Sequence, residues 1–273
     1  MPYSQPVFRP PAEANSLIVQ LTSGCATNRC RFCPMYKKKK FSSKSHPQLL
    51  EHLLHLKRHF PDHFTRAFLA DGDALTLPAE HVIAAMNLVR DHFPSVRRFG
   101  IYGSVFSLCG KTATELLQLK QAGLRVIYLG IESGDEEILR RMDKFMPVQK
   151  MIDNCRNVIS AGLNLSVMII IGLGGISRSG PHIRASLEMI NAIEPTHTSL
   201  LNLMLDHTPL LWDPDYSNFS LSDYFRETAT FIAGIRRRTI FRANHASNPV
   251  ALEGVLPDDC VRLLAEITAC HLR

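Results

Sequence analysis

Short runs of apolar and β-branched residues alternate six times along the chain with segments in which apolar positions recur every three or four residues. The short runs are typical of buried strands, and the longer segments of amphipathic helices. The predicted strands are residues 17–21, 66–70, 98–102, 125–131, 165–171 and 198–205. The predicted helices between them are residues 48–59, 79–92, 116–122, 148–161 and 183–193, with a short one around Ile138 and Met142. Thr112 and Glu115 have the spacing of a capping box that opens the helix at 116–122.

This order of elements predicts an α/β fold. Strands that alternate with helices form a parallel sheet with the helices outside it, and right-handed crossovers curl such a sheet. Six units make either a full open sheet or a partial barrel, and in both architectures ligands bind at the carboxyl ends of the strands. We therefore expect the residues that carry chemistry to follow the predicted strands.

The pattern changes after Pro209. Residues 212–220 are aromatic, polar and rich in turn formers, and predicted helices follow at 221–236 and 257–271, with a short strand at 239–242. No segment has the composition of an interdomain linker. We expect an N-terminal segment (1–14), a core (15–210) and a C-terminal α/β extension that closes the core (211–273).

Composition narrows the class of protein. The 273 residues are 45% hydrophobic and 21% charged, which excludes disordered, collagen-like and disulfide-stapled chains. No run reaches the roughly 20 apolar residues of a membrane span, and the N-terminus lacks the features of a signal peptide. We expect a cytoplasmic protein without a membrane partner.

The net charge of +6 suits an anionic partner without requiring one. The main basic run, residues 37–40, is interpreted as solvated loop charge, with a phosphate- or RNA-facing patch as the alternative. No nucleic-acid-binding signature accompanies this run, so nucleic acid as a partner has no support in the sequence.

Three of the seven cysteines, Cys25, Cys30 and Cys33, lie within nine residues after the first predicted strand. An odd cysteine count argues against a disulfide framework and fits a reducing compartment. Thiolates select zinc, copper(I) or iron–sulfur clusters. Three thiolates without a close fourth ligand suit a [4Fe–4S] cluster with one open iron, and the alternatives are structural zinc or unrelated buried thiols. The other cysteines are interpreted as core residues: Cys109, Cys155, Cys260 and Cys270.

With Phe32 one position before the last cysteine, this loop resembles the cluster loop of the radical S-adenosylmethionine (SAM) superfamily. The resemblance extends over residues 15–210. The usual spacing in that superfamily is C-x3-C-x2-C, and this chain has C-x4-C-x2-C, with one extra residue before Cys30. The resemblance implies a partial (βα)6 TIM-like barrel with an open parallel sheet. It also implies a [4Fe–4S] cluster on Cys25, Cys30 and Cys33, and SAM as the second cofactor.

The turn after the second predicted strand reads Asp71-Gly72-Asp73. It resembles the Gly-Gly-Glu segment that holds the SAM amino group in the superfamily, although Asp71 replaces the first glycine. Gly72 permits close approach of the backbone, and the resemblance assigns the carboxylate and a backbone oxygen of Asp73 to the cationic amine. The alternative is an ordinary Asp-Gly turn.

Turns after the later strands resemble further cofactor segments. Ser104 follows the third strand and is a candidate cofactor contact. Glu132 follows the fourth in a Gly-Ile-Glu-Ser-Gly turn, and the resemblance implies that Glu132 faces the polar end of SAM. Gly172 follows the fifth strand in a glycine turn that resembles the one passing the adenine in the superfamily. Residues 203–210 resemble a segment whose backbone meets the adenine in some members.

The extension contains a dense polar segment at residues 242–248, which resembles the tail of uncharacterised radical SAM proteins. We interpret Asn244, His245 and Asn248 as candidates for substrate binding or proton relay, with a hydrogen-bonded loop as the alternative. A second group of histidines shares one face of a predicted helix and is interpreted as solvated rather than metal-binding: His52, His55 and His59.

The resemblance implies an enzyme that reductively cleaves SAM to a 5′-deoxyadenosyl radical, which abstracts hydrogen from a substrate. Such an enzyme needs an external one-electron donor of the flavodoxin or ferredoxin kind. The reaction classes left open are small-molecule oxidation, as in coproporphyrinogen oxidase-like members, and RNA or peptide modification. No catalytic side chain is assigned, because the first step needs no protein base. The alternative is a non-catalytic iron–sulfur or zinc protein, which has no use for Glu132 or the Gly72-Asp73 turn.

Overall fold

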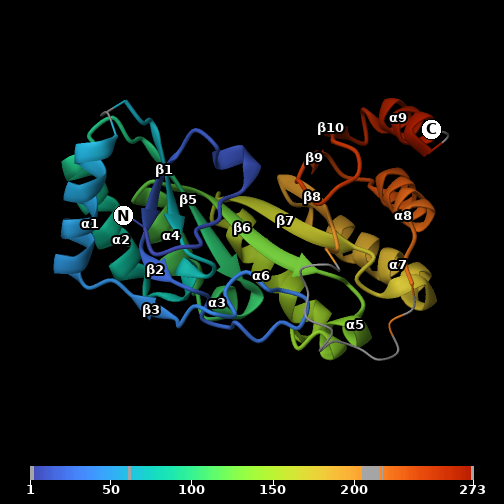
Figure 1. Cartoon of the computed structure of the whole chain (residues 1–273), viewed down its shortest axis with the longest axis horizontal. Coiled ribbons are helices and arrows are strands. Elements are labelled where there is room, and N and C mark those ends of the chain that lie inside the picture. Colours follow the sequence, from blue (N-terminus) through green and yellow to red (C-terminus); the bar gives the residue numbers. More distant parts are fainter. Residues whose placement is uncertain (1–2, 61–62, 205–215, 217, 272–273) are drawn as a thin grey trace. The chain divides into compact units, whose positions relative to one another are not determined.

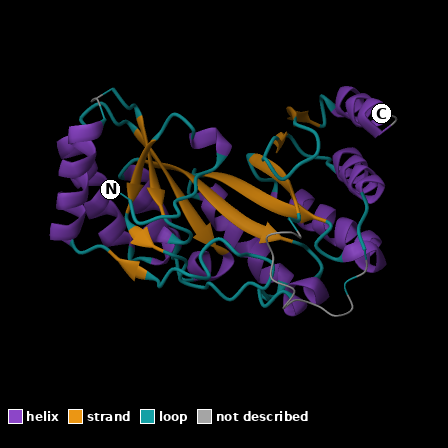
Figure 2. Cartoon of the chain, viewed as in Figure 1, coloured by secondary structure: helices purple, strands orange, loops and turns teal. Residues whose placement is uncertain are grey.

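The computed structural model describes residues 3–60, 63–204, 216 and 218–271, and these residues form an α/β fold (Figures 1 and 2). Eight of the described strands form one sheet in the order β1-β4-β5-β6-β7-β8-β9-β10. Their bounds are β1 Leu17–Gln20, β4 Arg66–Ala70, β5 Arg98–Ser104, β6 Leu124–Glu132, β7 Asn164–Ile171, β8 His197–Asn202, β9 Thr239–Ala243 and β10 Leu252–Leu256. The predicted α/β class is confirmed.

Strand pairing is mostly parallel. β4 pairs in parallel with β1 and β5, and β8 pairs in parallel with β7 and β9. β10 runs antiparallel to β9, from Leu252 opposite Ala243 to Leu256 opposite Thr239. Within each unit, the strands paired in parallel run in the same direction, so their carboxyl ends lie at one edge of the ladder.

The chain divides into two compact units. The first comprises Met1–Asn28, Met35–Leu129 and Asn157–Asn164, and the second comprises Arg29–Pro34, Gly130–Arg156 and Leu165–Arg273. The boundary falls within β6 and within helix α6 (Val148–Ser160). Residues 205–210, part of the segment that resembles an adenine contact, lie outside the described residues.

In the first unit the helices are α1 His46–His59, α2 Ala79–His92, α3 Val105–Cys109 and α4 Ala113–Gln121, with 3-10 turns η1 Pro11–Glu13 and η2 Ala74–Thr76. The short strands β2 Thr22–Ser23 and β3 Ser42–Ser43 pair with each other. The predicted capping box at Thr112 is present, since the backbone N–H of Thr112 donates to Glu115 at 2.8 Å. Phe68 and Phe99 are fully buried among the strands of this unit.

The interpretation of His52 as a solvated side chain is wrong. Its side chain is 6% exposed, and its Nε2 accepts a hydrogen bond from the backbone N–H of Gln20 at 3.1 Å. The prediction failed because a buried backbone N–H must find an acceptor, and the imidazole of α1 supplies it. His55 and His59 stack on each other with ring centroids 4.6 Å apart, away from this contact.

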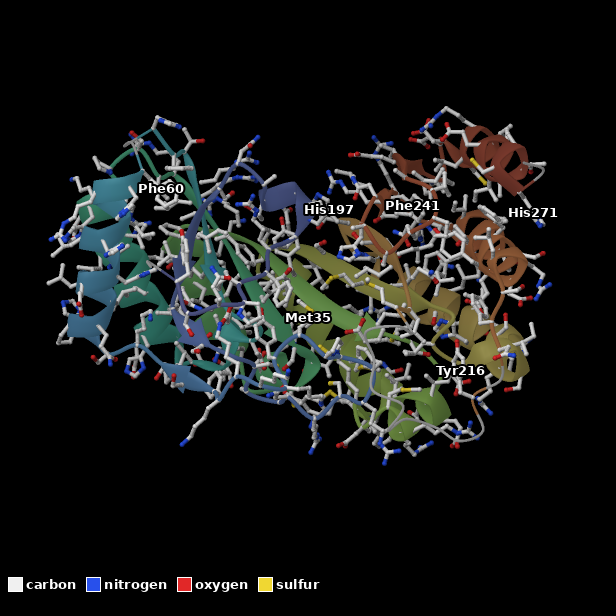
Figure 3. The ribbon with its side chains drawn as sticks, in the orientation of Figure 1. Met35, Phe60, His197, Tyr216, Phe241 and His271 are labelled. Carbon is white, nitrogen blue, oxygen red and sulfur yellow. The ribbon has the colours of Figure 1, made fainter. Side chains whose placement is uncertain are left out.

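In the second unit the helices are α5 Glu136–Arg141, α7 Gly175–Ile193, α8 Leu221–Gly234 and α9 Cys260–His271. Helix α7 begins well before the predicted start at residue 183, despite Gly180 and Pro181 within it. Buried polar contacts of this helix offset the low helix propensity of these two residues. β10 was not predicted, and its partner β9 carries Phe241, which is fully buried and labelled in Figure 3. Within the described residues, no helix combines the length and apolar character needed to cross a bilayer.

Candidate functional site

The three clustered cysteines lie on the chain between β2 and β3, and all three are half-buried thiols. Cys25 belongs to the first unit, whereas Cys30 and Cys33 belong to the second. Among the described residues, no three His, Cys, Asp or Glu side chains are grouped as ligands of a metal ion. The three-cysteine ligand set therefore stays a prediction.

In the second unit, Cys30 and Cys33 pack against an apolar cluster. The cluster consists of Phe32, Ile138, Met142, Ile170, Leu173 and Leu203. The backbone N–H of Arg31 donates to the carbonyl of Met142 at 3.0 Å, which ties this part of the loop to the end of α5. An apolar wall beside two thiols limits water access, and solvent exposure is one of the factors that set the potential of an iron–sulfur cluster.

Glu132 ends β6 with a φ of 71° and forms a buried ion pair with Lys144. Its Oε1 lies 2.5 Å from the Lys144 Nζ, which also lies 5.6 Å from the centre of the Phe32 ring. Burial alone would lower the pKa of Lys144, but Glu132 and then Cys30 and Cys33 raise it above its ordinary value. A buried cation thus stands beside two of the predicted cluster ligands.

Lys144 was missed in the sequence, because it lies in a loop after α5 and belongs to no motif there. Gly130 is required for its pairing: a Cβ at this position would fall on the Glu132 carboxylate and lie 3.0 Å from the Lys144 Nζ. The glycine of the predicted Gly-Ile-Glu-Ser-Gly turn therefore provides the space in which the ion pair forms.

The turn after Glu132 is bound to α7 by a buried histidine. The His182 Nδ1 lies 2.8 Å from the Ser133 hydroxyl, and its Nε2 lies 3.0 Å from the Ile170 carbonyl. Burial lowers the pKa of His182 to about 4, so the ring is neutral at pH 7. Because the Ile170 carbonyl can only accept, Nε2 carries the proton and Nδ1 accepts from Ser133. This side chain therefore joins the turns after β6 and β7.

A second contact supports the same turn, because the backbone N–H of Gly134 donates to the Ser186 hydroxyl at 2.9 Å. Asp135, the N-cap of α5, also accepts a bidentate interaction from Arg178 of α7. These contacts explain why α7 extends through Gly180 and Pro181: its N-terminal half is held by side-chain bonds to the β6 turn.

Gly172 ends β7 with a φ of 79°, a conformation that favours glycine. Its N–H donates to Glu227 Oε2 and its carbonyl accepts from the Tyr216 hydroxyl, both at 2.9 Å. A Cβ here would come within 2.8 Å of the Phe219 ring. The turn predicted to pass the adenine is thus held by residues of the extension, of which Tyr216 is labelled in Figure 3.

Glu227 is a buried carboxyl in α8 that the sequence did not indicate. Burial raises its pKa to about 7, and its Oε1 has no hydrogen-bond partner among the described residues. The N–H of Gly172 is therefore held by a carboxyl group whose charge changes near neutral pH.

In the first unit, Gly72 lies against Cys25. A Cβ on Gly72 would lie 3.1 Å from the Cys25 Cβ and 2.5 Å from the Tyr36 ring. The N–H of Gly72 donates to the carbonyl of Gly24 at 3.1 Å. Close backbone approach, which the sequence predicted for Gly72, occurs toward the chain that carries the first cysteine.

Asp73 and Ser104, predicted from two different strand ends, are brought together. The Asp73 carboxylate is 1% exposed and accepts from the Ser104 hydroxyl at 2.7 Å and the Ser104 N–H at 3.0 Å. Ser104 also caps α3. The carboxylate that the resemblance assigned to the SAM amine is therefore held in a defined orientation by Ser104.

The polar segment of the extension forms contacts within the second unit. The His245 Nδ1 lies 2.8 Å from the Ser247 hydroxyl, and the Asn248 side chain donates to the Leu200 carbonyl at 2.8 Å. Asn244 contacts Glu253 at 3.4 Å. These contacts agree with the alternative of a hydrogen-bonded loop, and the substrate role of Asn244, His245 and Asn248 stays a prediction.

Comparison with known proteins identifies the family. The family model described as Radical SAM superfamily matches residues 19–183, more than half of the chain, and covers the cysteine loop and the turns after β4 to β7. No curated protein sequence matches the chain.

Three similar solved structures are coproporphyrinogen III oxidase (HemN) from Escherichia coli, methylornithine synthase (PylB), and anSMEcpe with bound AdoMet and the Kp18Cys peptide. Their TM-scores are 0.61, 0.56 and 0.58, at 15%, 16% and 13% identity. The matches cover 80%, 82% and 80% of this chain, and 52%, 63% and 59% of those proteins.

The chain thus spans less than two thirds of each of these proteins, and at this identity the likeness is one of fold. It confirms the predicted partial TIM-like architecture. The family match and the cysteine loop agree in position along the chain. The chain therefore belongs to the radical SAM superfamily of enzymes.

Proposed function

We propose that this chain binds a [4Fe–4S] cluster through Cys25, Cys30 and Cys33 and uses SAM to oxidise or modify a substrate. The observation that carries the proposal is the superfamily match over residues 19–183, which contains all three cysteines. When bound, the reduced cluster would supply the electron that cleaves SAM to methionine and a 5′-deoxyadenosyl radical for hydrogen abstraction. The reductant would be an external flavodoxin- or ferredoxin-like protein.

The donor set fits such a cluster. Thiolates are the ligands that iron–sulfur clusters use, and three of them leave one iron open. Cys30 and Cys33 pack on an apolar wall, and after Glu132 these two cysteines raise the pKa of the nearby Lys144. A buried cation favours the thiolate forms that ligation requires.

We assign the polar end of SAM to the turns that resemble its binding segments in the superfamily. Glu132 and Lys144 offer a buried carboxylate and ammonium, which match the opposite charges of an amino acid group. Asp73, oriented by Ser104, offers a second carboxylate for the amine. Phe32 packs in the apolar cluster beside the two cysteines, where it excludes water.

We assign the adenine to the Gly172 turn. Its positive φ turns the chain at the end of β7, and Glu227 and Tyr216 hold that turn by its own N–H and carbonyl. Two residues of the proposed extension, Tyr216 and Glu227, therefore support this turn. We place the substrate on the side of Asn244, His245 and Asn248, which follow β9.

Anaerobic reconstitution tests the function. The wild-type chain should bind about four iron and four sulfide per protein, and SAM with dithionite should yield 5′-deoxyadenosine, measured by mass spectrometry. Cys25→Ser, Cys30→Ser and Cys33→Ser should each abolish the product. Cys109→Ser, which changes a half-buried thiol outside the loop, should retain it.

A wild-type chain that takes up stoichiometric zinc and no iron–sulfur cluster would contradict the enzymatic proposal and support the structural-zinc alternative. Assembly of a cluster without 5′-deoxyadenosine would support the non-catalytic iron–sulfur alternative. Incubation with candidate small molecules, peptides and RNA would then separate the reaction classes, through substrate-dependent gain of 5′-deoxyadenosine.

A further inference from the structure

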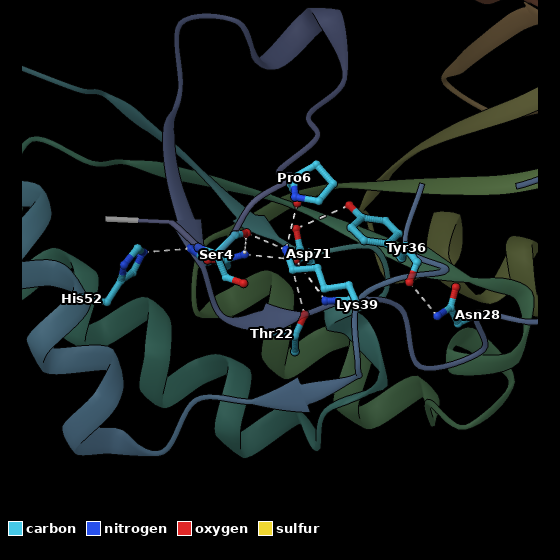
Figure 4. A network of polar contacts seen from close by, with 10 residues as sticks. Ser4, Pro6, Thr22, Asn28, Tyr36, Lys39, His52 and Asp71 are labelled. Carbon is cyan, nitrogen blue, oxygen red and sulfur yellow. Dashed lines mark hydrogen bonds and ion pairs between the residues drawn. The ribbon is translucent and has the colours of Figure 1, made fainter. Parts of the chain in front are cut away.

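We propose that Asp71 is a positioning residue that clamps both ends of the cysteine loop onto one buried carboxylate. This inference rests on the proposed function, because it gives the clamp its purpose. The superfamily segment that this turn resembles has a glycine where this chain has Asp71. Figure 4 shows the network around this side chain, which is 0% exposed.

The start of the loop is bound directly. Asp71 Oδ2 accepts from the backbone N–H of Gly24 at 3.0 Å, and Gly24 is the residue before Cys25. The Asp71 N–H donates to the Thr22 hydroxyl at 3.0 Å, and the Gln20 side chain donates to Oδ2 at 3.1 Å. The carboxylate and backbone of Asp71 therefore hold the chain as it leaves β1 and enters the loop.

The end of the loop returns to the same carboxylate. The Lys39 Nζ lies 2.5 Å from Asp71 Oδ2, and the Tyr36 hydroxyl lies 3.4 Å from Oδ1. The Lys39 ammonium also donates to the carbonyls of Ser4 and Pro6, at 2.6 and 2.8 Å. All three of its protons thus have acceptors.

The solvated interpretation of the basic run is therefore wrong for Lys39, which is 8% exposed, while its neighbours Lys38 and Lys40 are exposed. A pattern of four lysines does not show which one points inward. Its buried carboxylate partner lies 32 positions away in the sequence.

The segment between the two anchors, residues 25–38, carries all three cysteines. A loop whose ends are both fixed has fewer conformations to lose when its thiolates gather on one centre. Asparagine at position 71 would keep an acceptor for Gly24 but leave the Lys39 charge buried without a counter-charge. The loop would then open more often than the rest of the unit.

The experiment compares Asp71→Asn with Glu13→Gln in the full chain. Glu13 is also a buried carboxylate of the first unit, 2% exposed and bonded to the Tyr128 hydroxyl at 2.6 Å, but it does not touch the loop. In the apo protein, alkylation of each thiol under native conditions would be followed by mass spectrometry. The readout is the rate at Cys25 divided by the rate at Cys109, both half-buried thiols of the same unit.

We expect Asp71→Asn to raise this ratio about tenfold or more, as loss of a charged hydrogen bond implies, and Glu13→Gln to leave it unchanged. General destabilisation would speed both thiols alike, so an unchanged ratio in Asp71→Asn would overturn the clamp. If that variant does not fold, Lys39→Gln/Asp71→Asn removes the buried charge and is tested in the same way.

In the reconstituted protein, loss of the cluster to a chelator should be faster in Asp71→Asn by a similar factor. A wild-type chain that assembles no cluster would contradict the proposed function, whereas the alkylation ratio would still decide whether Asp71 anchors the loop. The two failures are therefore distinguishable.

Discussion

The Nζ of Lys144 lies 2.5 Å from the Oε1 of Glu132, and neither side chain is more than 10% exposed. The pair joins the end of β6 to the loop that follows α5. Two charges removed from water in this way depend on each other, because either one alone would be left buried without compensation. We therefore expect Glu132 and Lys144 to behave as one unit in stability measurements.

Lys144→Met should lower the free energy of unfolding by about 3–5 kcal/mol, because it leaves the Glu132 carboxylate buried and unpaired. The double variant Lys144→Met/Glu132→Leu should lose less free energy of unfolding than Lys144→Met alone, because it leaves no buried charge without a partner. Urea unfolding would measure both. The control is Arg140→Met, which breaks an exposed pair with Glu136 and should cost less than about 1 kcal/mol. Additive losses would show that the two residues are not coupled.

Gly130→Ala should destabilise the protein, because its methyl group would displace the Glu132 carboxylate and crowd the Lys144 ammonium. We expect a loss of about 1–3 kcal/mol, measured by urea unfolding. Gly180→Ala is the matched control. A Cβ there meets no atom within 4 Å, so the change should stay below about 1 kcal/mol. Equal effects at both glycines would contradict the steric argument.

Glu227 should make stability fall as the pH rises. Its pKa is raised from an ordinary 4.5 to about 7 by burial, so between these values the folded chain binds the proton more tightly than the unfolded chain. Stability from this group is present below pH 4.5 and is lost as the pH rises through 7. The free energy of unfolding of Glu227→Gln, relative to that of wild type, should therefore rise by about 3 kcal/mol between pH 4.5 and pH 7.5.

That difference would be measured as paired urea midpoints at each pH. Glutamine keeps an acceptor for the Gly172 N–H, so the variant isolates the charge. A constant difference between variant and wild type across this range would show that Glu227 does not titrate there.

His182 should have the opposite effect. Burial lowers its pKa from 6.5 to about 4, so the unfolded chain binds the proton more tightly between these values. Stability from the neutral ring is present above pH 6.5 and is lost as the pH falls through 4, by about 3 kcal/mol in all. His182→Gln should abolish this loss, as seen in unfolding midpoints from pH 7 to pH 4. A wild-type decline that persists in the variant would assign it to other groups.

The sequence alone predicted all six core strands within a few residues, because alternation of apolar runs and helical periods is local. It also predicted the family, because the cysteine loop and the strand-end turns are contiguous motifs that can be recognised without a structure. The capping box at Thr112 was predicted for the same reason, since its two partners are three residues apart.

Other features were decided by tertiary structure. The early start of α7 depends on bonds to the β6 turn that outweigh its internal glycine and proline. Lys144, Lys39 and Glu227 carry no local signal, because each is defined by a partner 12 to 55 positions away. Burial makes a charged or polar side chain depend on such a partner, and only folding brings the two together.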